Sequence, residues 1–157
     1  MNRPMRRKER QMPTASAQEL LTRSEYGIHS TVAADGQPYG VPVSYAYDGT
    51  DAIYFHGALV GQKLDNLLHN PRVCFTVVGY TQILPDQFST VYESAIAFGR
   101  ASVLDGDEKR RGLRLLAAKY NPGDPAAAEE YIERAFSATQ VVCIHIEQLT
   151  GKQRPAS

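Results

Sequence analysis

The chain has 157 residues, in which 17 lysines and arginines balance 17 aspartates and glutamates. This length suits one domain with a single hydrophobic core, and the balanced charge excludes an overall attraction to nucleic acid or to an anionic membrane. No apolar run approaches the roughly 20 residues that cross a bilayer, and the N-terminus is charged where a secretion signal would be apolar. We therefore expect a cytoplasmic protein.

The first 15 residues are predicted to be a basic leader that is mostly solvated, although a role at a dimer surface or near a ligand stays open. Its cations are Arg3, Arg6, Arg7, Lys8 and Arg10. After the leader, Ser16 and Glu19 have capping-box spacing, which predicts a helix over about 16–24. A folded domain over 16–152 and a disordered basic tail over 153–157 complete the expected organisation.

A series of strands follows the first helix. Alternating residues predict strands over 26–33 and 39–47, and Asp35-Gly36 between them is a strong hairpin turn. The second strand has one face of small residues, which suits either a flat ligand close to the backbone or tight packing on a neighbouring strand. The residues of this face are Gly40, Pro42, Ser44 and Ala46.

The remaining elements are assigned from the same kinds of signal. Pro71 ends a short helix, residues 81–90 contain Pro85 and no regular period and are expected to form a loop, and Gly99 is a candidate bend in a long strand. In chain order we expect a strand over 53–58, a helix over 64–70, strands over 72–79 and 91–104, helices over 107–120 and 125–138, and a strand over 141–149.

Six strands in hairpin-like succession, with helices inserted between some of them, predict a mainly β fold: a six-stranded antiparallel barrel with peripheral helices. Cys74 and Cys143 lie inside two of these strands. Their surroundings are those of small buried hydrophobes, and their spacing fits neither a disulfide framework nor a zinc site.

The segment from Tyr54 to Leu67 combines a strand, a glycine-punctuated loop and a helix start. Unpaired backbone N–H groups and the helix dipole favour an anion such as a phosphate at that helix end, and Lys63 adds a full charge. An exposed lysine beside a flexible turn is the alternative. Walker and Gly-x-Gly-x-x-Gly motifs are absent from the sequence.

Among the four histidines, His56 is the candidate for a functional role, and the alternative is that it is a satisfied barrel histidine. His56 leads from its strand into the glycine loop, where an imidazole can hydrogen-bond a ligand or donate a proton near neutral pH. His29 and His145 are interpreted as satisfied barrel histidines, and His69 as a partner of a helix C-terminal dipole.

Other common sites find no support in the sequence. No His-Glu-x-x-His motif, paired cysteines or carboxylate cluster indicates a metal site. Ser94 lacks the glycine-flanked elbow of a hydrolase nucleophile, but its hydroxyl remains a hydrogen-bond donor.

Many short segments, in register along nearly the whole chain, resemble the nitroimidazole-resistance family within the FMN-binding split β-barrels related to pyridoxamine 5'-phosphate oxidase. The segments that carry the resemblance are Met5 to Lys8, Glu25 to Gly27, Asp35 to Tyr45, Tyr54 to His56, Gly61 to Asn66, Asn70 to Phe75, Tyr92 to Ser94, Phe98 to Arg100, Lys119-Tyr120 and Ile146 to Lys152. The chain departs from true pyridoxamine phosphate oxidases in its shorter length and its lack of tryptophan, so that oxidase activity is not expected.

The resemblance implies a split barrel that holds FMN between the two protomers of a homodimer. The flavin phosphate would bind at Lys63 and its neighbours, and the ring would lie along the backbone of Pro42 to Tyr45 and beside Phe55 to Gly57. Ser94 would match a polar position that reaches the flavin. The implied cofactor-binding residues are Pro42, Val43, Ser44, Tyr45, Phe55, His56, Gly57, Gly61, Gln62, Lys63 and Ser94, and His56 matches the histidine of the family's active site.

The implied activity is reduction of the nitro group of a 5-nitroimidazole or similar heteroaromatic, with a nicotinamide or a redox partner as electron source. Two alternatives stay open. The chain is a flavin carrier or sensor without turnover, or its barrel holds haem or a deazaflavin.

Overall fold

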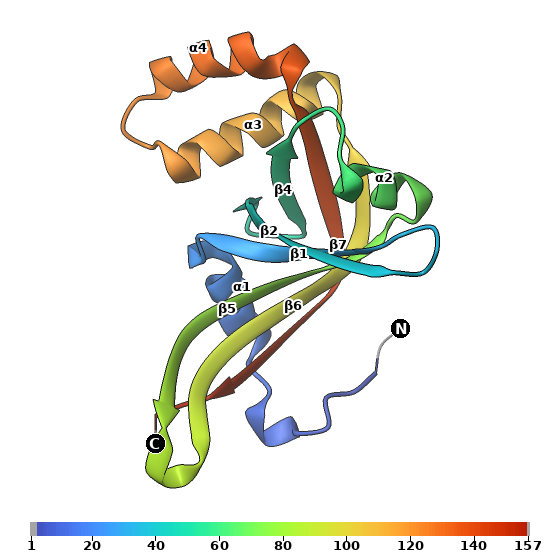
Figure 1. The fold of residues 1–157 in the computed structure, drawn as a ribbon. Helices are drawn as coiled ribbons and strands as arrows, with labels where there is room; N and C mark the ends of the chain where they lie inside the picture. Colours follow the sequence, from blue (N-terminus) through green and yellow to red (C-terminus); the bar gives the residue numbers. More distant parts are fainter. Residues whose placement is uncertain (1–2, 157) are drawn as a thin grey trace.

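Residues 3–156, the part of the chain that the computed structural model describes, form one curved antiparallel sheet of seven strands with helices outside it (Figure 1). The strand order is β2-β1-β5-β6-β7-β4-β3. The helices and strands are α1 (Thr14–Arg23), β1 (Tyr26–Val32), β2 (Pro38–Ser44), β3 (Ala46–Tyr47), β4 (Ala52–Gly57), α2 (Gln62–His69), β5 (Arg72–Leu84), β6 (Ser89–Val103), α3 (Gly106–Tyr120), α4 (Pro125–Ala135) and β7 (Gln140–Arg154), with short 3₁₀ turns η1 (Lys8–Arg10), η2 (Pro85–Gln87) and η3 (Phe136–Ala138).

The seventh strand arises because the predicted strand 39–47 is broken at Tyr45. The Tyr45 side chain is fully buried, and its hydroxyl donates to the carbonyl of Leu21. Its backbone N–H donates to the Tyr120 hydroxyl oxygen at 3.0 Å instead of to a neighbouring strand. Because β2 and β3 lie at opposite edges of the sheet, Tyr45 is also the link that brings these two edges together and curls the sheet into a split barrel.

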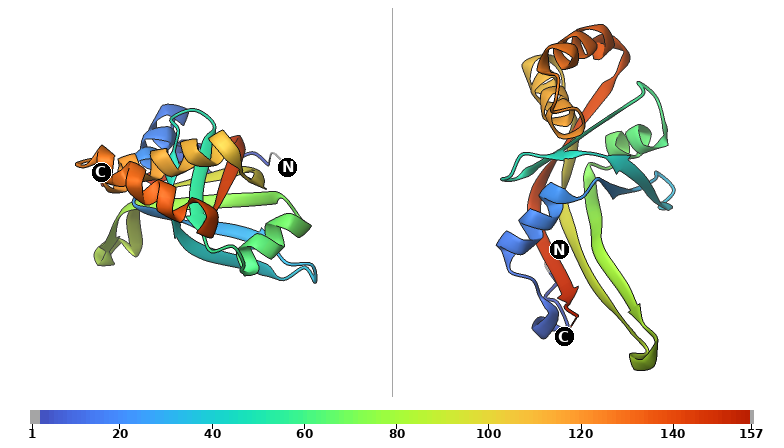
Figure 2. Two further views of the ribbon diagram at one scale, coloured as in Figure 1. Left: turned by 90° about the horizontal axis from the view of Figure 1, so that it is seen from above. Right: turned by 90° about the vertical axis from the view of Figure 1, so that its left-hand side faces the viewer.

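The main core lies inside the curl and under α1. Its largest fully buried side chains include Tyr45, Phe55, Phe75 and Ile144. Figure 2 shows α1 beside the lower part of β7, while α3 and α4 lie at the other end. Gly151 on β7 permits the close approach of α1, since a Cβ there would lie 2.9 Å from the Cβ atoms of Ala17 and Met12.

The helices α3 and α4 form an antiparallel pair that packs on β4 and β7. Gly112 on α3 faces Tyr54 and Val141, and a Cβ at this glycine would lie 3.0 Å from both side chains. A second small core of Leu113, Ile132 and Val141 joins the pair to the sheet. Ion pairs between Arg114 and Glu129 and between Arg110 and Glu133 link the exposed sides of the helices.

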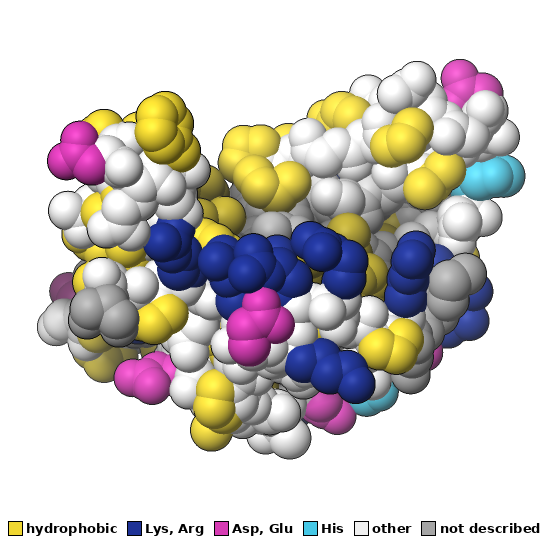
Figure 3. Space-filling model, turned by 90° about the horizontal axis from the view of Figure 1, so that it is seen from below, with side chains coloured by type: hydrophobic (Ala, Val, Ile, Leu, Met, Phe, Trp, Pro, Cys, Tyr) yellow, Lys and Arg dark blue, Asp and Glu magenta, His cyan; other side chains and the backbone are white. Residues whose placement is uncertain are grey.

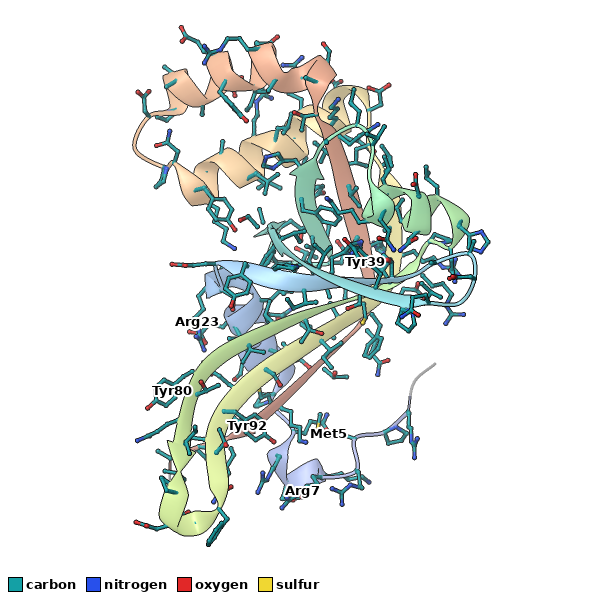
Figure 4. All side chains as sticks on the ribbon, viewed as in Figure 1. Met5, Arg7, Arg23, Tyr39, Tyr80 and Tyr92 are labelled. Atoms are coloured by element: carbon teal, nitrogen blue, oxygen red, sulfur yellow. The ribbon has the colours of Figure 1, made fainter. Side chains whose placement is uncertain are left out.

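The prediction of a loop over 81–90 is wrong. Strand pairing continues past a bulge at 78–81 as far as Leu84 opposite Ser89, so β5 and β6 form one long hairpin closed by η2. Pro85 begins the turn and therefore does not interrupt a strand. Figure 4 shows Tyr80 and Tyr92 on this hairpin, which projects beyond the rest of the sheet. The predicted bend at Gly99 is present, as a register shift between Phe98 and Gly99 in the pairing of β6 with β7.

Both ends of the chain are more ordered than the sequence predicts. The backbone of Gln11 bridges to Lys152, and the Met12 N–H donates to the Gly151 carbonyl at 2.8 Å. β7 continues to Arg154, where a disordered tail was expected. Residues 1, 2 and 157 of the expected leader and tail lie outside the described residues.

The face seen from below carries a band of lysine and arginine side chains (Figure 3).

Two local predictions near these ends and strands also need correction. α1 begins at Thr14 after Pro13, and no side-chain cap is present, so the capping box of Ser16 and Glu19 does not form. Cys74 and Cys143 are free and half-buried, because each lies on the strand face opposite its buried neighbours. No described helix has both the length and the apolar character needed to cross a membrane.

Candidate functional site

The predicted strand, loop and helix around Lys63 are formed by β4, residues 58–61 and α2. Gly61 precedes the helix with φ +155°, a conformation that favours glycine. Its carbonyl accepts the N–H groups of Leu64 and Asp65, and no side chain caps this helix end. The earlier N–H groups of the helix are therefore available to an anion.

Lys63 folds back over the end of β4. A Cβ placed on Gly57 would lie 3.3 Å from the Lys63 Cε atom and 3.4 Å from Nζ. The absence of a side chain at Gly57 thus lets the ammonium lie directly against the strand end. This short stretch of the molecule contains four of the candidates from the sequence, namely Gly57, Gly61, Gln62 and Lys63.

Two further candidates, Ser44 and His56, line one cavity of about 410 Å³ between the sheet and the pair α3 and α4. Ser44 ends β2, and His56 lies one residue before the end of β4. Partial burial lowers the pKa of His56, so its imidazole is neutral near pH 7 and can both donate and accept a hydrogen bond. The helical residues of the lining are Leu113, Leu116, Ala117, Tyr120, Asn121, Ala127, Ala128, Tyr131 and Ile132.

The end of α3 supplies residues whose role the sequence did not reveal. Tyr120 lines this cavity and also a neighbouring one of about 600 Å³, which Ser44 and Lys119 share. The Lys119 ammonium donates to the Ser24 carbonyl at 2.6 Å and lies 3.8 Å from the centre of the Tyr45 ring. Burial lowers the pKa of Lys119 to about 8. In the sequence, Lys119 and Tyr120 stand just before Asn121-Pro122-Gly123, and this position indicated only where a helix ends.

The backbone of β2 beside this cavity is open on its small-residue face. Gly40, Pro42 and Ser44 are exposed, while Val43 packs against the core and Tyr45 is fully buried. The N–H and carbonyl of Tyr45 both contact the Tyr120 hydroxyl. The sequence left open whether this face packs tightly on a neighbouring strand or lies open to a flat ligand. Because Gly40, Pro42 and Ser44 are exposed, the described residues do not show tight packing on another strand.

Ser94 lies on the same side of the sheet as Ser44 but far from the cavity that Ser44 lines. Strand registers join Ser44 to Tyr26 and Ser94 to Val78 and Lys152, and side chains opposite one another share a face. In the order β2-β1-β5-β6 the two serines are three strand spacings apart, about 14 Å along the sheet. Ser94 and His56 do not meet within one protomer.

This shared side of the sheet carries half-buried or exposed side chains on five neighbouring strands, and no described helix covers it. We call it the open face. Besides Ser94 and the exposed residues of β2, it includes Tyr26, Ile28, Ser30, Cys74, Thr76, Val78, Ile96, Phe98, Thr150 and Lys152.

Phe55, another candidate from the sequence, lies inside the barrel next to His29. Phe55 is fully buried, and its ring centre lies 4.7 Å from that of His29, so its side chain does not border the cavity. The prediction that His29 is a satisfied histidine is wrong, because neither ring nitrogen has a hydrogen-bond partner among the described residues. His145 is exposed, with Nδ1 3.7 Å from an Asp51 oxygen. Over residues 3–156, no group of three or more metal-ligating side chains occurs.

Comparisons with known proteins agree with this architecture. The model of the pyridoxamine 5'-phosphate oxidase family matches residues 13–153. An uncharacterised protein of Rhizobium meliloti is 25% identical over 125 residues, which are 75% of this chain and 78% of that protein.

Solved structures show the same fold at low sequence identity. A candidate 5-nitroimidazole antibiotic resistance protein from Bacteroides thetaiotaomicron has a TM-score of 0.73 and 22% identity, covering 90% of this chain and 85% of its own. The FAD and haem binding protein from Mycobacterium smegmatis has a TM-score of 0.80 and 22% identity, covering 92% and 73%. The flavocytochrome Anf3 from Azotobacter vinelandii has a TM-score of 0.77 and 20% identity, covering 98% and 73%. With its family match over residues 13–153 and this split-barrel fold, the chain belongs to the pyridoxamine 5'-phosphate oxidase family.

Proposed function

We propose that this protein is an FMN-dependent oxidoreductase that reduces the nitro group of small heteroaromatics such as 5-nitroimidazoles. Two observations carry the proposal: the cavity lined by Ser44 and His56, and the uncapped helix end that holds Lys63, which follows β4 in the chain. The cavity offers a place for a flat ring, and the helix end offers a place for an anion.

The residues present fit a phosphorylated flavin. Lys63 and the first N–H groups of α2 would bind the phosphate, since a full charge and unpaired donors act together there. The exposed backbone face at Pro42 and Ser44 has no side chains large enough to keep a ring away. FMN, when bound, supplies the electrons of the reaction, as hydride or in single steps.

The protein contributes binding and proton placement. The neutral imidazole of His56 would hydrogen-bond the substrate in the cavity or donate a proton to it. Leu113, Leu116 and Ile132 line the cavity with apolar surface that favours an aromatic ligand and excludes water.

A homodimer completes the proposal. The open face presents the exposed side chains of Val78 and Phe98 and the half-buried Ile28 without a covering helix, and neighbouring apolar side chains of this kind are typical of an interaction site. A second copy on this face would bring its own Ser94 to the flavin that the first copy holds, which one protomer cannot do. The electron donor would be a nicotinamide or a redox protein.

Binding of FAD and haem by structural neighbours supports two alternatives, a flavin protein without turnover and a barrel that holds another cofactor. The visible spectrum of the purified protein distinguishes oxidised flavin from haem. Reduction of a nitroimidazole by the flavin-loaded protein, at a rate above that of free FMN with the same reductant, then tests the enzymatic proposal. Flavin content without such turnover would favour the carrier or sensor.

A further inference from the structure

Buried polar side chains gather at one place in the barrel, where α2 crosses β1. Among the described residues, four polar side chains are buried, and three of them are His29, Thr31 and Asn66. The Asn66 amide donates to the Thr31 hydroxyl oxygen at 2.9 Å. His29 and Thr31 are two residues apart on β1 and so point to the same side, toward α2, the helix whose first turn contains Lys63.

His29 differs from its two neighbours because its hydrogen bonds are unmade. Its exposed fraction is 0%, and both ring nitrogens lack a partner among the described residues. A buried polar group without a partner destabilises the folded chain, and each such case in a native protein calls for an explanation. An apolar residue of similar size would suit this position better if stability alone decided it.

The charges around His29 come from one direction. Its ladder neighbours Val41 and Phe75 and its ring contact Phe55 carry no titratable group. On α2, Asp65 and His69 are exposed, and His56 on β4 alternates with Phe55 and points to the other face. Burial, together with the positive charge of Lys63, lowers the pKa of His29 to about 4, and no other charged side chain among the described residues contributes to this shift.

We propose that His29 is the proton-linked cation of the phosphate site: when a phosphate dianion binds beside Lys63, the neutral imidazole takes up one proton from solvent. This inference rests on the proposed phosphate site. The two negative charges of the anion are then balanced by the Lys63 ammonium and the His29 imidazolium. A dianion at Lys63 reverses the sign of the local field, and in a poorly solvated interior that field acts strongly on a neighbouring imidazole.

The first test compares the wild-type chain with His29→Leu by calorimetric titration of the apoprotein with FMN. Heats measured in two buffers of different ionisation enthalpy give the number of protons taken up. We expect wild-type binding to take up more protons than the variant, by a difference approaching one near pH 6. Riboflavin, which lacks the phosphate, is expected to show no difference. His145→Leu, at an exposed histidine, is the matched control and should behave as the wild type.

The same variant links binding to stability. We expect His29→Leu to unfold at a higher temperature than the wild type without ligand and yet to bind FMN about tenfold more weakly. Equal proton uptake and equal affinity in the two proteins would overturn the inference. A less stable His29→Leu would do so as well, because His29 would then have a structural role.

A second measurement needs no variant. The ring carbon and nitrogen chemical shifts of His29 in labelled wild-type protein report its charge directly, and we expect them to move to imidazolium values when FMN is added at pH 6. Unchanged neutral shifts in the saturated protein overturn the proposal. If instead Lys63→Ala leaves FMN affinity unchanged, the phosphate site itself is wrong and this inference falls with it. If Lys63 matters and His29 stays neutral, only this inference fails.

Discussion

The hydroxyl of Tyr120, at the end of α3, accepts the backbone N–H of Tyr45 at 3.0 Å, in the single residue that separates β2 from β3. The same hydroxyl faces the carbonyls of Tyr45 and Glu25. One phenol thus holds the broken strand, the helix end and the wall of the cavity in a fixed relation.

Replacing Tyr120 by phenylalanine should lower the free energy of unfolding by about 1–3 kcal/mol, because the Tyr45 N–H loses its partner in a partly buried place. Urea denaturation measures this loss. Tyr131→Phe is a suitable control, since Tyr131 also lines the cavity but its hydroxyl makes no hydrogen bond to the described residues. Equal losses in both variants would show that the Tyr120 hydroxyl does not stabilise the break.

Lys63→Ala should weaken FMN binding about tenfold or more, since a charge-assisted contact to a phosphate contributes roughly 1.5–3 kcal/mol. Fluorescence titration of the apoprotein measures the Kd, and riboflavin affinity should change little. Lys8→Ala, which removes an exposed cation from the leader, controls for net charge. An unchanged Kd for FMN would reject Lys63 as the phosphate ligand.

His56→Ala should retain flavin but reduce nitroreductase turnover, because the side chain faces the cavity and not the helix end that holds Lys63. The ratio of flavin absorbance to protein absorbance and the rate of nitroimidazole loss separate the two effects. Flavin lost from a folded variant would instead assign His56 to cofactor binding.

Acid should destabilise the protein through His29. In the unfolded chain this imidazole titrates near its ordinary pKa of 6.5, whereas in the folded chain its pKa is about 4. As the pH falls from 6.5 to 4, the unfolded chain gains a proton that the folded chain does not, so stability is lost over this window. The shift corresponds to about 3 kcal/mol as an order of magnitude.

Urea denaturation of wild-type protein and His29→Leu at pH 7 and at pH 5 checks this expectation. Both proteins share the contributions of their carboxylates, and the difference between them isolates His29. The variant should lose less stability between the two pH values. Parallel losses would show that His29 has a nearly ordinary pKa.

Val78→Asp should convert a dimer into monomers and reduce flavin content at the same time. Val78 is exposed in the centre of the open face and lies opposite Ser94, and a carboxylate there would have to be desolvated at the interface. Light scattering after size exclusion gives the mass. Leu68→Asp, on the exposed side of α2, should leave the mass unchanged, and a monomeric wild type would remove the basis for the prediction.

Local signals in the sequence located most of the elements. Gly36 has φ +87° at the predicted Asp35-Gly36 turn, and α3 runs over Gly106–Tyr120, within one residue of its predicted range. These features depend on neighbours close in the chain, as helix periodicity and turn chemistry do. The strand and the helix on either side of residues 58–61 were predicted from local signals of the same kind.

The remaining features depend on contacts between distant residues. Tyr45 leaves its strand because of Tyr120, 75 positions later, and Leu84 stays in a strand because Ser89 pairs with it across a turn that looked like a loop. Whether His29 has partners is a property of the packed interior that no alternation of residues reveals. Likewise, Lys119-Tyr120 is one of the segments that resemble the family, but the sequence does not show that these two residues contact Tyr45.

The break at Tyr45 makes the spacing of residues in this part of the chain unusually strict. Deletion or insertion of one residue within β2 would rotate every side chain beyond it to the opposite side of the sheet. Pro42 or Ser44 would then point into the core, and a bulky valine would occupy the shallow surface beside the cavity. Length variation in homologues should therefore collect in the turns before Pro38 and after Tyr47, where it leaves this alternation intact.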